Sequence, residues 1–251
     1  MHDVQVDHTR SFALIGHSGD GKTTLGESLL HVAGATRERG RVEDGSSVLN
    51  HLPEEKGHRT HSVASHLFGF DWHDSHFTLV DTPGDPNFQG DGEVALQAVD
   101  GAVLVVDAVD GVKSGTSRML HLAEANDVPV VAFVNGLDRE RADLEAALDS
   151  LGLLDVKPVL LSLPVTHDSH LDGVVDLIDL TCHGEAAEAE ELPAEISEAA
   201  RRFHEAAVEA VAEQDDELLE VYLETGDLTR EQVIRGLAKG VRDHVLLPVL
   251  C

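Results

Sequence analysis

Eight residues near the start of the chain have the types and the spacing that bind phosphate groups. They are Gly16-His17-Ser18-Gly19-Asp20-Gly21-Lys22-Thr23, and they fit the pattern G-x-x-x-x-G-K-[ST]. Glycines let backbone N–H groups turn toward phosphate oxygens, and the N-terminus of a following helix adds partial positive charge. We expect Lys22 to contact the β- and γ-phosphates of a nucleoside triphosphate, Thr23 to ligate Mg²⁺, and Thr24 to extend the nucleotide-binding set. A chance glycine-rich turn is the alternative interpretation.

A second motif, Asp81-Thr82-Pro83-Gly84, follows the apolar run 77–80. In a phosphate-loop protein an Asp at this place holds Mg²⁺, commonly through water. The Gly84 N–H would meet the γ-phosphate, so its position would sense whether that phosphate is present. A plain turn with Pro83 at its second position is compatible with this role.

A third motif, Asn135-Gly136-Leu137-Asp138, follows the apolar run 128–134 and resembles the guanine-selecting pattern N-K-x-D without its Lys. Asp138 could accept hydrogen bonds from guanine N1–H and the 2-amino group. Adenine lacks that pair of donors, so its binding would leave the carboxylate unpaired. The alternative is that Asn135 and Asp138 are only a helix N-cap and its lead-in.

Strand-like and helix-like segments alternate around these motifs. The continuous apolar runs 12–15, 77–80, 102–106 and 128–134 are typical of parallel strands buried on both faces, and the segments 25–33, 113–126 and 138–151 are long enough for helices. This alternation predicts an α/β fold with a doubly wound, mostly parallel sheet flanked by helices. Ligands of such sheets bind at the carboxyl ends of the strands, where all three motifs lie.

The rest of the chain is less regular. Residues 37–61 are polar and without sustained periodicity, which in a compact domain indicates a functional or a disordered loop. Residues 158–163 and 173–180 are expected to form a pair of strands, and 185–191 an acidic linker. Three helices follow, the third opening on the capping box Thr229–Gln232, and the last expected strand is 245–250.

Composition excludes several classes of protein. The chain has 251 residues, with 47 Asp and Glu against 18 Lys and Arg and a net charge of −29, so its bulk surface is unsuited to direct nucleic-acid binding. An organism with high internal salt and a family that is merely acidic both account for this charge. No apolar stretch is long enough to span a membrane, and the two cysteines do not suggest a disulfide framework, so we expect a cytoplasmic protein. The histidines at 51, 58, 61, 66, 73 and 76 are interpreted as solvated loop residues rather than a zinc site.

Beyond its motifs, the chain resembles the GTP-binding domain of translation elongation factor G from about Phe12 to Cys251. Besides the order of the three motifs, the resemblance rests on Asp100–Val112, Leu52–Lys56, Gly173–Ile178, Leu192–Glu195 and Pro248–Cys251. It implies a P-loop NTPase core over residues 1–155, an inserted α+β subdomain over 156–228, and the last helix and strand of the core over 229–251. It also implies GTP or GDP and Mg²⁺ as ligands, the ribosome as a partner of the full-length protein, and a truncated chain.

Four departures from that family concern the site. The family has a His after D-T-P-G that positions the attacking water, and this chain has Asp85. The family's phosphate-loop Asp is Gly19 here, with Asp20 one position later, and the Lys that packs on guanine is Gly136. The Mg²⁺-ligating Thr of the family's first switch corresponds to Thr60 if a one-residue gap is allowed, and otherwise to His61.

The sequence therefore predicts a GTP-binding domain that hydrolyses GTP slowly. The expected catalytic set is Lys22 and Gly84, with Asp85 at the place of the family's His, and the expected metal set is Thr23, Thr60 and Asp81. A guanine-nucleotide module with little or no hydrolysis is the first alternative, favoured by Asp85 and Gly136, and a P-loop ATPase is the second.

Overall fold

The computed structural model describes residues 6–50, 52, 54–55, 62–167, 170–188 and 193–251. The chain forms two compact units, Met1–Asp107 with Val112–Val130, and Ala108–Gly111 with Val131–Cys251, which we call unit 1 and unit 2. Within these described residues, one sheet has seven strands in the order β2-β3-β1-β4-β5-β10-β6, and three further strands form a small separate sheet. This architecture confirms the predicted α/β fold with a mostly parallel sheet flanked by helices.

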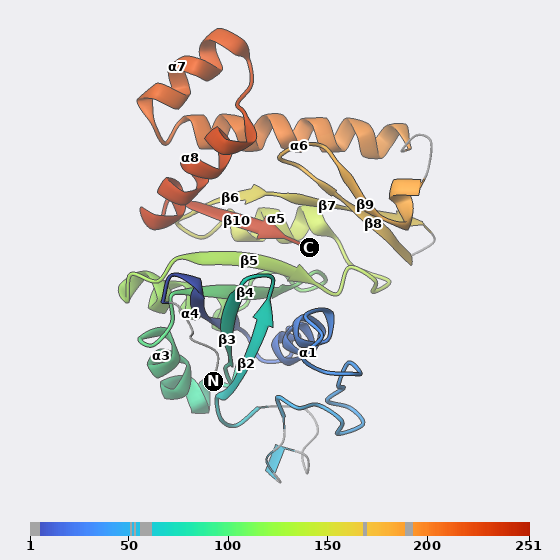
Figure 1. Ribbon diagram of the computed structural model, residues 1–251, viewed down its shortest axis with the longest axis vertical. Coiled ribbons are helices and arrows are strands. Elements are labelled where there is room, and N and C mark those ends of the chain that lie inside the picture. The colour runs from blue at the N-terminus through green and yellow to red at the C-terminus, as the bar shows by residue number, and fades with distance from the viewer. Residues whose placement is uncertain (1–5, 51, 53, 56–61, 168–169, 189–192) are drawn as a thin grey trace. The chain divides into compact units, whose positions relative to one another are not determined.

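Unit 1 consists of β-strands, most of them parallel, with α-helices beside them (Figure 1). Its strands are β1 (Thr9–Gly16), β2 (His66–Trp72), β3 (Ser75–Asp81) and β4 (Gly101–Asp107), and its helices are α1 (Lys22–Val32), α3 (Gln89–Leu96) and α4 (Ser114–Ala125), with the short 3-10 helices η1 (Val6–His8) and η2 (Pro86–Phe88). Strand β1 pairs in parallel with both β3 and β4, whereas β2 pairs antiparallel with β3 and lies at the end of the sheet. The carboxyl ends of β1, β3 and β4 therefore lie at one edge.

The core of unit 1 explains why β1 is an unbroken apolar run. Ala13, Leu14 and Ile15 are fully buried, because side chains on both faces of a central parallel strand are covered. A cluster of buried side chains joins β1 to α1, β2, β3 and the 40–50 segment; its members are Leu14, Leu30, Leu49, Phe70 and Leu79. Helix α1 approaches the side chain of Leu49 closely at Gly26, where a Cβ atom would lie 2.5 Å from Leu49 Cδ1.

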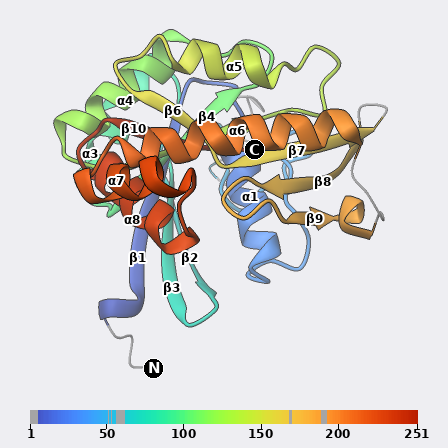
Figure 2. The same ribbon diagram turned by 90° about the horizontal axis from the view of Figure 1, so that it is seen from above.

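The described part of unit 2 combines three parallel strands, a small antiparallel sheet and four α-helices. Its elements are β5 (Val130–Asn135), β6 (Lys157–Leu160), β10 (Leu246–Leu250), β7 (Ser162–His167), β8 (His170–Asp176), β9 (Cys182–Gly184), α5 (Leu144–Leu151), α6 (Ala194–Ala212), α7 (Asp216–Thr225), α8 (Arg230–Arg242) and the 3-10 helix η3 (Glu185–Glu188). Strand β10 pairs in parallel with β5 and β6, and β8 pairs antiparallel with β7 and β9. Figure 2 shows α6 as the long orange helix of this unit.

Helices α6, α7 and α8 of unit 2 pack on a shared apolar cluster that includes Val211, Leu218, Val233, Leu237 and Leu246. One apolar face of each helix therefore packs into the core. The predicted capping box opens α8: Thr229 Oγ1 accepts from the Gln232 N–H, and the Gln232 side chain accepts from the Thr229 N–H.

Several predicted boundaries were wrong. The run 158–163 is not one strand: it divides between β6, which pairs with β10, and β7, which pairs with β8 in the small sheet. Helix α5 begins at Leu144 and not at residue 138, because the Asp143 side chain caps it by accepting from the Ala146 N–H. Strand β2, α3 and the helical turn η3 were not predicted. The inserted subdomain at 156–228 stays a prediction.

Two expectations from composition concern the chain as a whole. Among the described residues, no helix combines the length and the apolar character that crossing a bilayer would need. Cys182 and Cys251 are both free thiols.

Candidate functional site

The phosphate-loop pattern lies where the sequence analysis expected it, between the end of β1 at Gly16 and the start of α1 at Lys22. Gly19 and Gly21 have φ values of 86° and 91°, a left-handed region that glycine enters without strain. Gly16 lies so close to β4 that a Cβ atom would be 2.5 Å from the Val105 carbonyl oxygen. The glycines are thus required by the path of the loop.

Lys22 lies within this loop and is only 6% exposed. Its Nζ donates hydrogen bonds to the carbonyl oxygens of His17, at 2.8 Å, and Gly16, at 3.2 Å. Burial lowers the pKa of Lys22, and the nearby Asp81 and Asp20 carboxylates act in the opposite direction. The ammonium is thereby held against the loop that would surround a phosphate group.

Thr23 and Asp81 join the first motif to the second. The Thr23 hydroxyl donates to Asp81 Oδ2 at 2.7 Å. Asp81 is fully buried, and among the described residues its other oxygen, Oδ1, has no hydrogen-bond partner. Burial raises the pKa of Asp81 to about 6, although the hydrogen bond from Thr23 opposes this shift.

This pair of residues fits a Mg²⁺ ion. Mg²⁺ prefers oxygen ligands, and a buried carboxylate oxygen that lacks a partner beside a hydroxyl group supplies them, directly or through water. The third predicted ligand, Thr60, and its alternative His61 lie outside the described residues. The Ser62 hydroxyl is 3.4 Å from the Thr23 hydroxyl.

Gly84 brings the second motif against the phosphate loop. A Cβ atom on Gly84 would lie 2.4 Å from Lys22 Nζ and 2.6 Å from the Ser18 backbone nitrogen. Thr82 fixes the segment from the other side, because its hydroxyl donates to the Leu14 carbonyl oxygen of β1 at 2.6 Å. The segment Thr82–Gly84 thus touches both β1 and the phosphate loop, and the plain turn with Pro83 at its second position stays a prediction.

A cavity of about 400 Å³ lies between the two motifs. Its walls include the predicted residues Ser18, Gly19, Gly21, Lys22, Thr23, Thr24, Thr82 and Gly84. Among the described residues, the lining also includes Val42, Glu43, Asn50 and Ser62, which the sequence analysis missed. They come from or follow the aperiodic segment 37–61, in which no pattern distinguishes one polar residue from another.

Glu27 on α1 fixes the segment that carries three of these residues. Its Oε1 accepts hydrogen bonds from the Ser47 hydroxyl at 2.6 Å and from the Leu49 N–H at 2.9 Å. The carboxylate is completely buried, and a Cβ atom on Gly40 would lie 2.4 Å from its Oε2. An acidic residue in the second turn of α1 was the available signal, but a charged residue on a helix is more often solvated.

Two other phosphate-loop residues, Asp20 and His17, are not among the described residues that line the cavity. Asp20 is buried and forms an ion pair with Lys113, Oδ1 to Nζ, at 2.8 Å. His17 packs on the start of α4, where a Cβ atom on Gly115 would lie 2.6 Å from its Nδ1. The nucleotide-binding role expected for these two side chains stays a prediction.

Asp85 caps the turn that follows the second motif. Its Oδ1 accepts from both the backbone N–H and the side-chain amide of Asn87, each at 2.8 Å. This makes Asp85 the N-cap of η2, so its carboxylate is directed into its own turn.

The third motif belongs to unit 2 and is described by itself. Asn135 ends β5, and its carbonyl oxygen accepts from the Ala108 N–H at 2.9 Å. Gly136 has a φ value of 82°, which suits glycine, and Asp138 is exposed. The alternative that this motif is only a helix N-cap and its lead-in was wrong, since α5 is capped by Asp143. Guanine recognition by Asp138 stays a prediction.

One histidine interpretation needs correction. His66 is not solvated: it is buried at the start of β2, with Nε2 at 2.9 Å from both carboxylate oxygens of Glu55, and it stands opposite Asp81 in the register of β2 with β3. A buried His beside a carboxylate is satisfied by that ion pair or hydrogen bond. Of the other five histidines, those at 51, 58 and 61 lie outside the described residues.

Comparison with known proteins agrees with this geometry. Residues 7–239 match the family described as "Elongation factor Tu GTP binding domain". Elongation factor G of Thermotoga petrophila is 33% identical over 99% of this chain and 36% of its own length, and elongation factor G of Thermotoga sp. strain RQ2 is 32% identical with the same coverage. A crystal structure of a Thermus thermophilus protein superposes with a TM-score of 0.86 at 34% identity, over 96% of this chain and 37% of that one. The chain thus spans about 36% of the curated relatives it matches.

Proposed function

Because the chain belongs to the elongation factor Tu GTP binding domain family, we propose that it binds GTP and GDP with Mg²⁺ and hydrolyses GTP slowly. The observation that carries this proposal is the meeting of two motifs on one cavity. Lys22 and Thr23 begin α1, Asp81 ends β3 and accepts the Thr23 hydroxyl at 2.7 Å, and Gly84 lies against Lys22 and Ser18 at the same cavity.

The roles of these residues follow from charge. Lys22 would move its hydrogen bonds from the loop carbonyls of Gly16 and His17 to phosphate oxygens, which carry more negative charge. Thr23 and Asp81 would hold Mg²⁺, which when bound neutralises charge on the phosphates. The Gly84 N–H would donate to the γ-phosphate, and its proximity to Ser18 places it at the same loop.

Hydrolysis would be attack of a water molecule on the γ-phosphorus, in line with the departing GDP. Donors that are already in place lower the barrier, because they need no reorganisation when charge develops on the γ-phosphate. The bond from the γ-phosphorus to the β–γ bridging oxygen breaks as the bond to the water oxygen forms. Positioning and charge stabilisation by Lys22 and the Gly84 amide would supply the catalysis.

Asp85 favours a second candidate, a guanine-nucleotide-binding module with little or no hydrolysis. Its carboxylate is engaged with Asn87 and carries a negative charge beside the place expected for the γ-phosphate. Such a charge repels the phosphate and does not orient water as an imidazole would. Single-turnover GTP hydrolysis with and without ribosomes separates the two candidates: a rate that ribosomes leave at the uncatalysed level supports the module.

Selectivity for guanine is proposed from Asp138. The experiment is a titration of fluorescent GDP with Mg²⁺, with unlabelled GDP and ADP as competitors, at low and at molar KCl. Displacement by GDP but not ADP, lost in Asp138→Ala, supports guanine recognition despite Gly136. Equal displacement by ADP would favour the ATPase alternative. Binding that needs molar KCl would support a halophilic origin for the charge of −29.

The role of the longer protein is a further proposal. Similarity to elongation factor G over about a third of that protein's length supports a ribosome-associated role in the cytoplasm for a full-length protein that carries this domain. Binding of the nucleotide-loaded chain to ribosomes, measured by co-sedimentation, tests whether this domain is sufficient for that contact.

A further inference from the structure

An ion pair links the phosphate loop to the start of α4. Lys113 Nζ donates to Asp20 Oδ1 at 2.8 Å, the Asp20 side chain is completely buried, and that of Lys113 is 22% exposed. The two residues are 93 positions apart in the chain, and they follow β1 and β4, which pair in parallel.

A buried carboxylate in a phosphate loop works against the function of that loop. Burial raises the pKa of Asp20, because the carboxylate loses its hydration, and the Lys113 ammonium opposes this shift. The Lys22 ammonium is also near enough to interact with Asp20. An unneutralised Asp20 would therefore attract the ammonium group that phosphate needs and would repel the phosphate itself.

Contacts at the start of α4 fix the backbone of Lys113. Its backbone N–H donates to the hydroxyl of Thr116, at 3.2 Å, and Thr116 is completely buried in the first turn of α4. On the same turn, Gly115 leaves room for His17 of the phosphate loop. The start of α4 thus contacts the phosphate loop at two adjacent places, through the Lys113–Asp20 ion pair and where His17 lies against Gly115.

We propose that Lys113 is a positioning residue of the nucleotide site: by neutralising Asp20 it leaves Lys22 available to phosphate and fixes the phosphate loop on α4. This inference rests on the proposed nucleotide binding and adds a residue that none of the three motifs contains. Lys113 does not line the cavity, so it acts through Asp20 and not by touching the nucleotide.

The test is a cycle of three variants, Lys113→Met, Asp20→Asn and the double variant, titrated with fluorescent GDP and Mg²⁺. Lys113→Met should weaken GDP binding by at least about tenfold, because it leaves a buried carboxylate next to Lys22. Asp20→Asn alone should weaken GDP binding less than Lys113→Met does, because it removes the charge that Lys113 opposes. The double variant should return to within about threefold of the unaltered chain, since the charge that Lys113 opposes is gone.

The matched control is Lys157→Met. Lys157 forms an ion pair with Glu213 at the same 2.8 Å distance, but both side chains are about half exposed and lie in unit 2. Its loss should leave GDP affinity unchanged, as expected for a solvated pair. Melting curves of all variants show that each is folded at the temperature of the titration.

Three outcomes overturn the inference. In the first, Lys113→Met is folded and binds GDP as the unaltered chain does. In the second, Lys113→Met binds weakly and the double variant does not recover, which would mean that Lys113 acts by packing alone. In the third, the unaltered chain binds no GDP; the proposed function then fails first and the inference falls with it.

Discussion

Replacing Gly84 by alanine tests whether the second motif lies in direct contact with the phosphate loop. The added methyl carbon would lie 2.4 Å from Lys22 Nζ, 2.6 Å from the Ser18 nitrogen and 2.7 Å from Ser18 Cα. Lys22 could withdraw, because the atom concerned is the end of a flexible side chain. Ser18 could not, because its contacts involve backbone that is fixed by the path of the phosphate loop.

The magnitude follows from these distances. Gly84 has no positive φ, so alanine meets a steric barrier and not a conformational one. Overpacking of this kind costs about 1–3 kcal/mol of unfolding free energy unless the segment moves away. A shift of the Gly84 amide by about 1 Å would lower GTP hydrolysis by up to about 100-fold, because a misplaced donor no longer matches the reacting phosphate.

The assay combines urea unfolding of the nucleotide-free chain with single-turnover GTP hydrolysis. Gly90→Ala is the matched control: Gly90 lies near the start of α3, nothing stands within 4 Å of its Cβ position, and alanine should add up to about 1 kcal/mol of helix stability. If Gly84→Ala and Gly90→Ala give the same unfolding midpoint and the same hydrolysis rate, the close approach of Gly84 to Ser18 is not a property of the protein in solution.

Three more predictions follow from the site. The pKa of Asp81 is raised to about 6 from an ordinary 3.8, which means that the folded state holds this proton more tightly than the unfolded state does. The unfolding free energy of the nucleotide-free chain should therefore fall as the pH rises from about 4 to 6. Asp81→Asn should remove that fall, which is about 3 kcal/mol at most, in urea titrations carried out at each pH. Glu27→Ala should cost roughly 2 kcal/mol and abolish hydrogen-exchange protection of the Leu49 amide, since two buried donors lose their acceptor; protection that persists at Leu49 would contradict this. Asp85→His should raise the rate of single-turnover GTP hydrolysis. Asp85→Asn keeps the N-cap of η2 and should leave the unfolding free energy of the protein unchanged. A histidine variant that hydrolyses GTP no faster would count against a catalytic role for this position.

The phosphate loop and the strands that carry the motifs were predictable because their signals are local. Gly16, Gly21 and Lys22 have a spacing that follows from the geometry of a strand, a turn and a helix N-terminus. The apolar runs that became β1, β3, β4 and β5 are continuous because parallel strands are covered on both faces. The order of these runs and motifs along the chain was therefore enough to predict the edge of the sheet where the carboxyl ends of the strands lie.

The contacts that complete the site were not predictable, because they pair polar residues far apart in the chain. Glu27 with Ser47, and Asp20 with Lys113, are ordinary charged or polar residues in the sequence, and only the fold shows that they are buried together. Strand β2 was missed for a different reason. His66, Gly69 and Asp71 interrupt its apolar pattern, and its position at the end of the sheet leaves half of it exposed.

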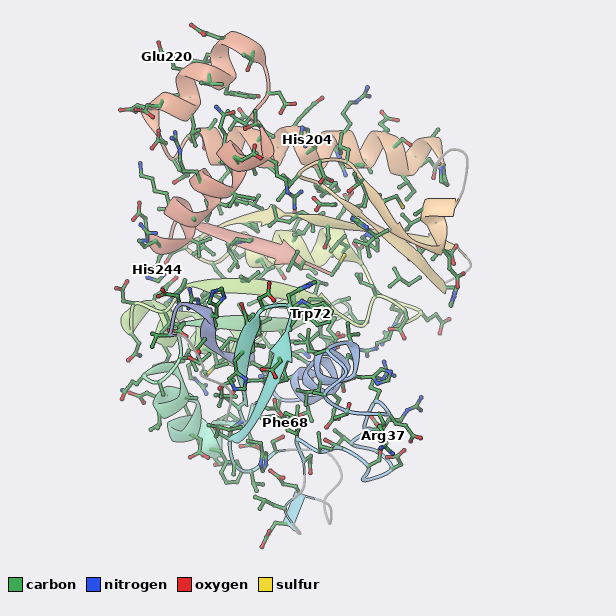
Figure 3. All side chains as sticks on the ribbon, in the orientation of Figure 1. Arg37, Phe68, Trp72, His204, Glu220 and His244 are labelled. Carbon is green, nitrogen blue, oxygen red and sulfur yellow. The ribbon has the colours of Figure 1, made fainter. Side chains whose placement is uncertain are left out.

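That exposed strand has a consequence for how the protein behaves in concentrated solution. Leu67 and Trp72 of β2 are 69% and 42% exposed, and Trp72 and Phe68 are marked on this strand in Figure 3. A terminal strand with apolar side chains is a template for pairing with a second molecule, and like charge on both molecules opposes that pairing. With a net charge of −29 the repulsion between molecules is strong at neutral pH, and it vanishes near the isoelectric point expected from the sequence, about 4.6. Turbidity should therefore rise steeply as the pH approaches that value, and exchanging Leu67 for lysine should delay its onset.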